Sequence, residues 1–217
     1  MKTIPNEVIF SVLRTLKVIN PGDLYYENYL GHLSKRGESF FDVYHFSWQW
    51  VIEHHPKTIL EIGVRTGISI CQLLSAYIDL SIIEKIVLCD LFNDGFISPG
   101  LVKLNLKTLG IWEHIKDKVE FLIGDSKTKI LEYKGNNDTK FDWLLIDGSH
   151  DKKDARQDLE NVKSMVNVGG VIVFDDISPP PEMDLASVWH EFKNAYKDEF
   201  EWNENYDGKG IAWAIKK

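Results

Sequence analysis

Five short apolar segments, each ending on or beside an acidic residue, alternate with amphipathic stretches along residues 58–176 of this 217-residue chain. The segments are rich in Val, Ile, Leu and Phe, and they lie at 58–62, 85–90, 119–123, 141–147 and 170–175. Runs of this length are typical of buried strands. Between them the apolar residues recur at helical spacing, as they do after the fourth segment at Ala155, Leu159, Val162 and Val166. Strands that alternate with helices predict an α/β fold with a parallel sheet and right-handed crossovers.

The two ends of the chain have different patterns. Residues 200–206 and 211–215 flank the sequence Asp207-Gly208-Lys209-Gly210, which predicts two strands joined by a tight glycine-containing turn. Residues 1–56 are expected to be helical and irregular, and they end in an aromatic run from Phe40 to Trp50. We therefore expect an N-terminal cap segment over 1–56 and a ligand-binding α/β domain over 57–217, which together form one structural unit.

The composition is that of a globular protein with an acidic balance. The chain is 44% hydrophobic and 27% charged, with a formal net charge of -8. Phosphate-backbone binding needs clustered Lys and Arg, so we expect no nucleic-acid partner. Cys71 and Cys89 lie in apolar stretches without metal-ligand spacing, as core thiols of a reducing compartment do. Because no signal-peptide pattern or membrane span is visible, we expect a cytoplasmic protein without a membrane partner.

The acidic residues at the strand ends predict a binding site. In a parallel sheet these ends fall on one edge, where open α/β folds bind ligands. One acid there is ordinary strand-end polarity, but a whole row of them favours a ligand site. Phosphate ligands bind glycine-rich loops and helix N-termini rather than acids. S-adenosylmethionine suits an acidic edge, since it carries a sulfonium, an α-ammonium and a ribose diol. The acids are Glu61, Asp90, Asp125, Asp147, Asp175 and Asp176.

Sequence motifs accompany these strands in a fixed order. They are Glu61-Ile62-Gly63-Val64-Arg65-Thr66-Gly67-Ile68-Ser69, Asp90, Gly124-Asp125-Ser126, Ile146-Asp147-Gly148-Ser149-His150 and Gly169-Gly170-Val171-Ile172-Val173-Phe174-Asp175-Asp176. With the terminal hairpin, this pattern resembles the class I S-adenosylmethionine-dependent methyltransferases over about residues 47–217. It most resembles the branch of metal-dependent sugar and macrolide O-methyltransferases, some of which are labelled cephalosporin hydroxylases. The resemblance implies a Rossmann-like, seven-stranded, mostly parallel sheet of order 3-2-1-4-5-7-6, with the last strand antiparallel and helices on both faces.

The resemblance also implies roles for residues that bind the cofactor. Glu61 would orient the turn and the methionine ammonium, Ser69 would bind the methionine carboxylate, and Asp90 would accept the ribose hydroxyls. Asp125 and Ser126 would flank the adenine. Many relatives have more glycine where this chain has Val64-Arg65-Thr66, which leaves Arg65 as either a functional or a solvated turn residue. The predicted cofactor-binding residues are Glu61, Gly63, Thr66, Gly67, Ser69, Asp90, Asp125 and Ser126.

Asp147, Asp175 and Asp176 need a further explanation, because clustered carboxylates repel unless they are protonated or bridged by a cation. All-oxygen ligation suits Mg²⁺ or a similar hard divalent cation, and the resemblance implies the same three metal ligands. The alternative is that one Asp caps the next helix and another is solvated. His150, three residues after Asp147, is the predicted general base. A helix cap or a surface residue is the alternative for it.

These observations predict an S-adenosylmethionine-dependent O-methyltransferase that acts on a hydroxyl of a small molecule or sugar, with Mg²⁺ assistance, His150 as general base and Asp147 beside it. A nitrogen or nucleic-acid acceptor is one alternative, and a non-catalytic cofactor-binding module is another. A hydroxylase is disfavoured, since non-haem iron oxygenases generally need two His and one carboxylate. The acceptor's identity stays open, and the aromatic N-terminal segment is compatible with a homo-oligomer.

Overall fold

A computed structural model describes residue 15 and residues 42–93, 97–178 and 184–217 of the chain. Most of the predicted N-terminal cap over 1–56 therefore lies outside the described residues. Its last part forms helix α3 (Val43–His54), which begins at Asp42, whose side chain accepts hydrogen bonds from the Tyr44 and His45 backbone N–H groups. Phe46 and Trp50 of α3 are buried, and the Phe46 ring lies 4.7 Å from the Trp213 ring. In the described part, the aromatic segment thus packs into the core.

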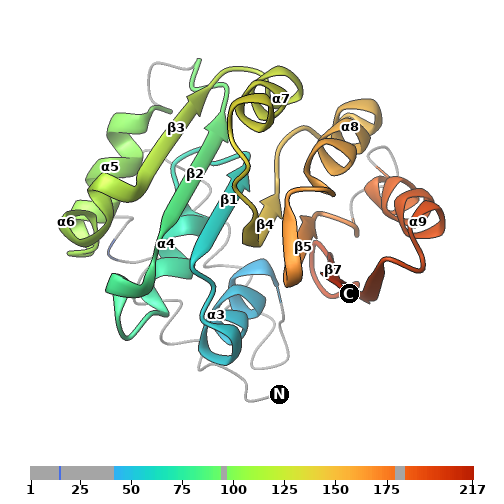
Figure 1. Cartoon of the computed structure of the whole chain (residues 1–217), viewed down its shortest axis with the longest axis horizontal. Helices are drawn as coiled ribbons and strands as arrows, with labels where there is room; N and C mark the ends of the chain where they lie inside the picture. Colours follow the sequence, from blue (N-terminus) through green and yellow to red (C-terminus); the bar gives the residue numbers. More distant parts are fainter. Residues whose placement is uncertain (1–14, 16–41, 94–96, 179–183) are drawn as a thin grey trace.

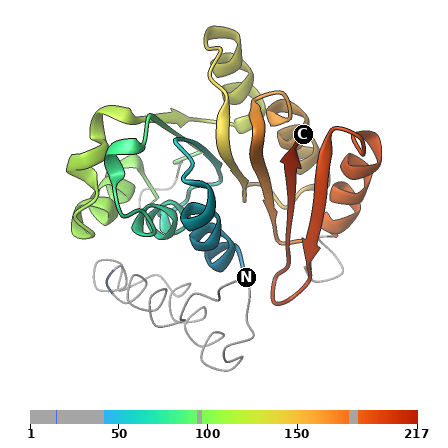
Figure 2. The same cartoon turned by 60° about the horizontal axis from the view of Figure 1, so that its bottom comes forward.

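A seven-stranded sheet runs through the middle of the described part, and its order β3-β2-β1-β4-β5-β7-β6 confirms the prediction. Strands β1 to β5 are parallel, whereas β7 is antiparallel to both β5 and β6. Figure 2 shows the β6–β7 hairpin beside β5. The strands are β1 (Thr58–Ile62), β2 (Lys85–Asp90), β3 (Val119–Ile123), β4 (Phe141–Ile146), β5 (Val166–Asp175), β6 (Phe200–Asn205) and β7 (Ile211–Lys216).

Helices cover both faces of this sheet, as predicted (Figure 1). One face packs against α3, α4 (Ile68–Ser75), α5 (Pro99–Thr108) and α6 (Trp112–Ile115). The other packs against α7 (Ser126–Asn136), α8 (Lys152–Val162) and α9 (Leu185–Ala195). Short 3₁₀ turns at Leu80–Ile82 and Lys116–Lys118 precede β2 and β3. Successive strand residues alternate between the two cores: Ile59 joins the first and Leu60 the second, and both are fully buried.

One strand boundary differs from the sequence prediction. Val166 was expected to continue the helix after Asp147, but α8 ends at Val162 and Val166 is the first residue of β5. Val166 pairs with Phe141, and the β4–β5 register then shifts before Trp143 pairs with Val171. Gly169 lies within this irregularity at φ +80°. The extra residues there let β5 begin four positions earlier than the apolar run indicates.

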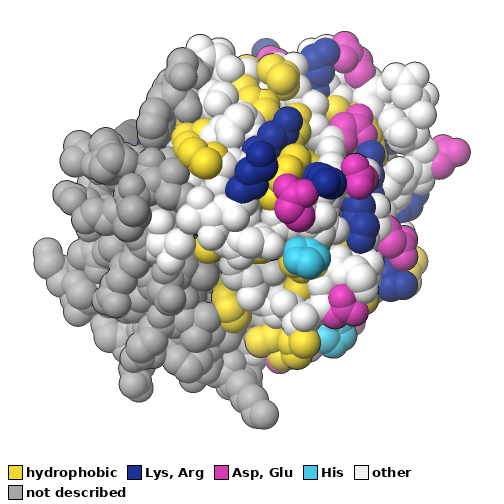
Figure 3. Space-filling view, turned by 90° about the vertical axis from the view of Figure 1, so that its left-hand side faces the viewer, with side chains coloured by type: hydrophobic (Ala, Val, Ile, Leu, Met, Phe, Trp, Pro, Cys, Tyr) yellow, Lys and Arg dark blue, Asp and Glu magenta, His cyan; other side chains and the backbone are white. Residues whose placement is uncertain are grey.

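None of the described helices is long and apolar enough to cross a membrane. On the face shown in Figure 3, which is the left-hand side of Figure 1, acidic and basic side chains are interspersed with apolar ones. Charges of one sign do not gather on that part of the described surface.

Candidate cofactor and acceptor site

Two adjoining pockets lie along the carboxyl edge of the parallel strands. The first, of about 490 Å³, covers the ends of β1, β2 and β3 and is lined by residues that include Asp90, Asp125 and Ser126. The second, of about 360 Å³, covers the ends of β1, β4 and β5 and includes Thr66, His150 and Asp176 in its lining. The pockets are neighbours because four residues line both of them: Gly63, Arg65, Asp147 and Gly148.

The turn after β1 requires glycine at two positions. Gly63 has φ +88°, and a Cβ there would lie 1.9 Å from the Asp147 carbonyl oxygen. Gly67 has φ +82° and precedes α4, and a Cβ there would lie 2.9 Å from Val102 Cγ1. Any other residue would strain the backbone and push β4 or α5 away. These glycines therefore allow the turn to pack closely against Asp147 and Val102.

Glu61 and Ser69 interact with each other beneath the second pocket. Glu61 is 1% exposed, and its Oε1 accepts a hydrogen bond from the Ser69 hydroxyl. Burial is the main cause that raises the pKa of Glu61 to about 8, and Asp90 adds to it while Ser69 opposes it. The role of Ser69 toward a methionine carboxylate stays a prediction, since its hydroxyl is directed at Glu61.

Two features beside Glu61 are suited to a polar ligand. The Thr66 hydroxyl is buried without a hydrogen-bond partner among the described residues, and Thr66 lines the second pocket. Helix α4 begins at Gly67 without a side-chain cap. Its first backbone N–H groups and its dipole favour an anion such as a carboxylate. Thr66 and the start of α4 thus fit the amino-acid portion of S-adenosylmethionine.

Asp90 joins the turns that follow β1 and β2. Its Oδ2 accepts from the Arg65 backbone N–H at 2.8 Å, and its Oδ1 accepts from the Phe92 backbone N–H at 3.0 Å. Arg65 and Phe92 both have positive φ, at 50° and 46°. Each carboxylate oxygen can accept a further hydrogen bond, which suits a ribose diol. The backbone N–H of Arg65 therefore positions Asp90, which gives Arg65 a role that does not depend on its side chain.

Asp125 and Ser126 lie where β3 passes into α7. The Asp125 side chain caps α7 by accepting from the Lys127 backbone N–H at 3.0 Å. Ser126 hydrogen-bonds Asp158 of α8, which is only 1% exposed. Burial is the main cause that raises the pKa of Asp158 to about 6. Asp158 is not among the residues predicted from the sequence, although its position one residue before Leu159 places it beside the apolar face of α8.

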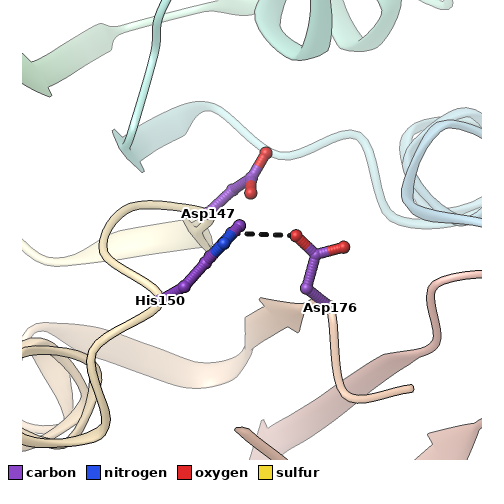
Figure 4. A group of neighbouring side chains, drawn as sticks. All are labelled: Asp147, His150 and Asp176. Atoms are coloured by element: carbon purple, nitrogen blue, oxygen red, sulfur yellow. Dashed lines mark ion pairs between the residues drawn. The ribbon is translucent and has the colours of Figure 1, made fainter. Parts of the chain in front are cut away.

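The acidic cluster in the second pocket is not made of the same three residues as the predicted metal site. One ligand atom each from Asp147, His150 and Asp176 lies within 4.8 Å of the others. His150 Nε2 is 3.0 Å from Asp176 Oδ2 (Figure 4). Asp175 is buried in the last position of β5 and does not join this group. Successive strand side chains point to opposite faces, and Asp176 leaves the strand with φ +60°, so the two acids separate.

The carboxyl groups still influence one another's charge. Burial, followed by Asp175 and Asp176, raises the pKa of Asp147 well above its usual value. Burial and then Asp176 raise the pKa of Asp175 to about 7. Burial opposes ionisation of Asp176, but His150 and Lys209 together outweigh it and lower the pKa of Asp176. A cluster that holds protons in this way can exchange them for a divalent cation.

Lys209 also belongs to this site, although no sequence motif predicts it. It belongs to the turn between β6 and β7, lines the second pocket, and places Nζ 3.0 Å from Asp176 Oδ1. The pattern Asp207-Gly208-Lys209-Gly210 indicated only a tight turn. Its place in the site depends on the pairing of β7 with β5, which puts Ile211 opposite Asp175.

A seven-stranded sheet of this order, with β7 antiparallel and helices on both faces, is the Rossmann-like fold of the class I S-adenosylmethionine-dependent methyltransferases. Residues 60–177 match the model of a family described as "Methyltransferase domain". This match covers more than half of the chain, and the chain belongs to that family.

Solved structures share the fold at low sequence identity. The O-methyltransferase from Bacillus cereus in complex with SAH is 18% identical, with a TM-score of 0.60 and coverage of 79% of each chain. The SAH-bound methyltransferase PaMTH1 from Podospora anserina is 14% identical, with a TM-score of 0.66 over 100% of this chain and 90% of that one. TomG, an O-methyltransferase from Streptomyces achromogenes in complex with SAM, is 16% identical, with a TM-score of 0.62 and coverage of 79% and 78%. A comparison with curated proteins gives no match.

Proposed function

We propose that this methyltransferase transfers a methyl group from S-adenosylmethionine to a hydroxyl oxygen of a small molecule or sugar. The observation that carries the proposal is the group formed by Asp147, His150 and Asp176 in the second pocket, of which Asp147 also lines the first. The cofactor's adenosine would occupy the first pocket, its methionine portion would lie beside Thr66 and the start of α4, and the acceptor would enter the second pocket. The methyl group would then meet the acceptor oxygen near Asp147.

The Asp147 and Asp176 carboxylates, with ligand atoms within 4.8 Å of each other, are oxygen donors that suit Mg²⁺ or a similar hard cation. Asp147 and Asp176 would hold it, and Asp175 would add negative charge behind them. Such a cation, when bound, lowers the pKa of an acceptor hydroxyl and orients a neighbouring oxygen. A vicinal diol is the acceptor chemistry that fits these two roles.

His150 is the proposed general base. Its side chain is 44% exposed at the second pocket, so an acceptor can reach it, while Asp176 pairs with Nε2. Nδ1 would accept the proton of the acceptor hydroxyl, and the Asp176 carboxylate would stabilise the imidazolium that forms. A direct bond from His150 to a metal would exclude this role, and metal binding by His150→Ala separates the two: if His150 is the base, the variant binds the metal as the unchanged protein does.

The acceptor is proposed to be neither nucleic acid nor amine. The chain has net charge -8, and Figure 3 shows basic side chains interspersed with acidic ones on one face. A nucleic-acid acceptor would need a basic track for its phosphates. An amine acceptor is disfavoured because β4 is followed by Asp147-Gly148-Ser149-His150 and not by the Asn/Asp-Pro-Pro-aromatic motif of amino-group methyltransferases.

The proposal is tested with methyl-labelled S-adenosylmethionine and a panel of diol, monohydroxyl and amine acceptors, with Mg²⁺ or with EDTA. We expect methylation of diols that EDTA abolishes and Mg²⁺ restores. His150→Ala should lower turnover by about 10²-fold or more. His190→Ala is the matched control. His190 is 48% exposed, its Nε2 lies 3.4 Å from Glu204 Oε2, and it does not line either pocket. Equal turnover of His150→Ala and His190→Ala would refute the role of His150 as general base. Turnover that persists in EDTA would refute the requirement for a metal.

A further inference from the structure

Lys209 contacts the acid that is proposed to hold the metal. The Lys209 ammonium lies 3.0 Å from Asp176 Oδ1 and 3.4 Å from Asp176 Oδ2. His150 Nε2 lies 3.0 Å from the same Oδ2. Both oxygens of Asp176 therefore already face a cationic or donor group, and a metal can bind Asp176 only by changing these contacts.

The backbone that carries Lys209 is fastened to the segment after β5. The Ser178 backbone N–H donates to the Lys209 carbonyl at 2.6 Å, and the Ile177 N–H donates to the Gly210 carbonyl at 3.1 Å. A Cβ on Gly210, which has φ +76°, would lie 2.4 Å from Ser178 Oγ. The turn and this segment thus pack backbone to backbone. Lys209 is held beside Asp176 by its main chain, not only by its charge.

The positive charge of Lys209 acts on the whole acidic cluster. It lowers the pKa values of Asp147 and Asp175 as well as that of Asp176. The Lys209 side chain is nonetheless 56% exposed, whereas that of Asp176 is 5% exposed. The ammonium can therefore move away from Asp176 and stay hydrated, while the buried carboxylate keeps its place.

We infer that Lys209 is a built-in counter-cation that occupies Asp176 and competes with a divalent metal for it, so that metal binding displaces the Lys209 ammonium. This inference rests on the proposed function, because it takes Asp147 and Asp176 as the metal-holding residues. The competition weakens metal binding, and the displaced ammonium stays at the second pocket, where the acceptor enters. Lys209 is thus a positioning residue for Asp176 that sets the metal affinity of the site.

The test measures Mn²⁺ binding by electron paramagnetic resonance and Mg²⁺ binding by calorimetry on the full chain without cofactor. Lys209→Met removes the charge and keeps an unbranched side chain that is one atom shorter, and Lys209→Arg keeps the charge. We expect Lys209→Met to bind both ions about fivefold more tightly than the unchanged protein, which corresponds to the roughly 1 kcal/mol that an ion pair of this exposure contributes. Lys209→Arg should bind them as the unchanged protein does.

Lys193→Met is the matched control. Lys193 forms an ion pair of similar kind with Glu204 on the same hairpin, at 2.8 Å, and does not line the second pocket. Its removal should leave metal binding unchanged. Equal metal affinity in Lys209→Met and the unchanged protein would overturn the competition and leave the metal site standing. Failure of all variants, Lys209→Met included, to bind either ion would instead remove the metal from the proposed function, and the inference with it.

Thermal unfolding provides a second measurement, and its metal-free part does not depend on metal affinity. Without metal, Lys209→Met should melt at a lower temperature than the unchanged protein, because the acidic cluster has lost a neutralising charge. Mg²⁺ should raise its melting temperature more than that of the unchanged protein. A metal-free melting temperature equal to that of the unchanged protein would contradict the counter-cation role, and Lys209→Gln repeats this comparison with a second neutral side chain.

Discussion

The backbone of Asp147 lies directly against Gly63, so closely that a Cβ on Gly63 would be 1.9 Å from the Asp147 carbonyl oxygen. The Asp147 N–H also donates to the carbonyl of Ile62 at 2.9 Å. The turn that is proposed to face the cofactor and the strand end that carries the acidic cluster are thereby fixed to each other. Neither can move without the other.

Gly63→Ala should destabilise the protein by about 3 kcal/mol or more, since it adds a backbone clash to a positive-φ position. Urea denaturation measures the loss. Gly135→Ala is the control, because Gly135 lies in α7 with nothing within 4 Å of an added Cβ. That variant should be more stable than the unchanged protein by about 0.5–1 kcal/mol. Equal stability of the two variants would contradict the close contact at Gly63.

Asp90→Asn should weaken S-adenosylmethionine binding by about tenfold or more, because the amide nitrogen cannot accept the bonds that one carboxylate oxygen now accepts. Calorimetric titration gives the dissociation constant. Asp142→Asn is matched to it: Asp142 also accepts two backbone N–H bonds, from Lys57 and Thr58, but at the opposite edge of the sheet. Cofactor binding should not change in that variant, and a parallel loss in both would assign the effect to stability alone.

S-adenosylmethionine binding should depend on the ionisation of Glu61, whose pKa is raised to about 8 by burial. At pH 7 the carboxyl is mostly protonated, whereas a cationic methionine ammonium favours the carboxylate. Binding should therefore release a proton from Glu61 at pH 7, and calorimetry in buffers of different ionisation enthalpy detects it. Glu61→Gln removes this proton and keeps an acceptor for Ser69. Equal proton release by both proteins would exclude Glu61 as the source.

The stability of the fold should change with pH through Asp158. Its carboxyl has a pKa of about 6 when folded, against an ordinary value of 3.8, so the folded state favours the protonated form. Its stabilising contribution is full below pH 3.8 and is lost as the pH rises through 6. Asp158→Asn should therefore stabilise the protein at pH 8 by about 3 kcal/mol relative to its effect at pH 4. Thermal unfolding at both pH values measures this, and a pH-independent difference would contradict it.

Most of the sheet could be predicted from the sequence, because strands buried on both faces are continuous apolar runs. Leu60 and Val87, on β1 and β2, are fully buried and belong to such runs. The Gly-containing turn after β1 was also recognisable, since its glycines meet a backbone requirement that other residues cannot. The start of β5 was not, because the pairing of Val166 with Phe141 depends on an irregularity between strands and not on local pattern.

The candidate site could be predicted in position but not in detail. That acids share an edge follows from strand direction alone, but which acids face each other depends on side-chain orientation. Asp176 turns toward His150 because it leaves β5 at positive φ, and Asp175 stays behind in the strand. Lys209 comes from a turn 33 residues after Asp176 in the chain. Its proximity depends on strand order and register, which no local motif encodes.

The reversed direction of β7 has a consequence for how the acceptor side of this fold can vary. Because Ile211 opens β7 opposite Asp175, the preceding hairpin turn lies at the same edge as the ends of the parallel strands. The backbone of this turn is fixed to Ile177 and Ser178, but the Lys209 side chain is 56% exposed, so its charge can change while the ladder of β5 and β7 stays intact. The turn thus supplies a wall of the reaction chamber whose side chains can vary, and new acceptor preferences can arise there without redesign of the scaffold.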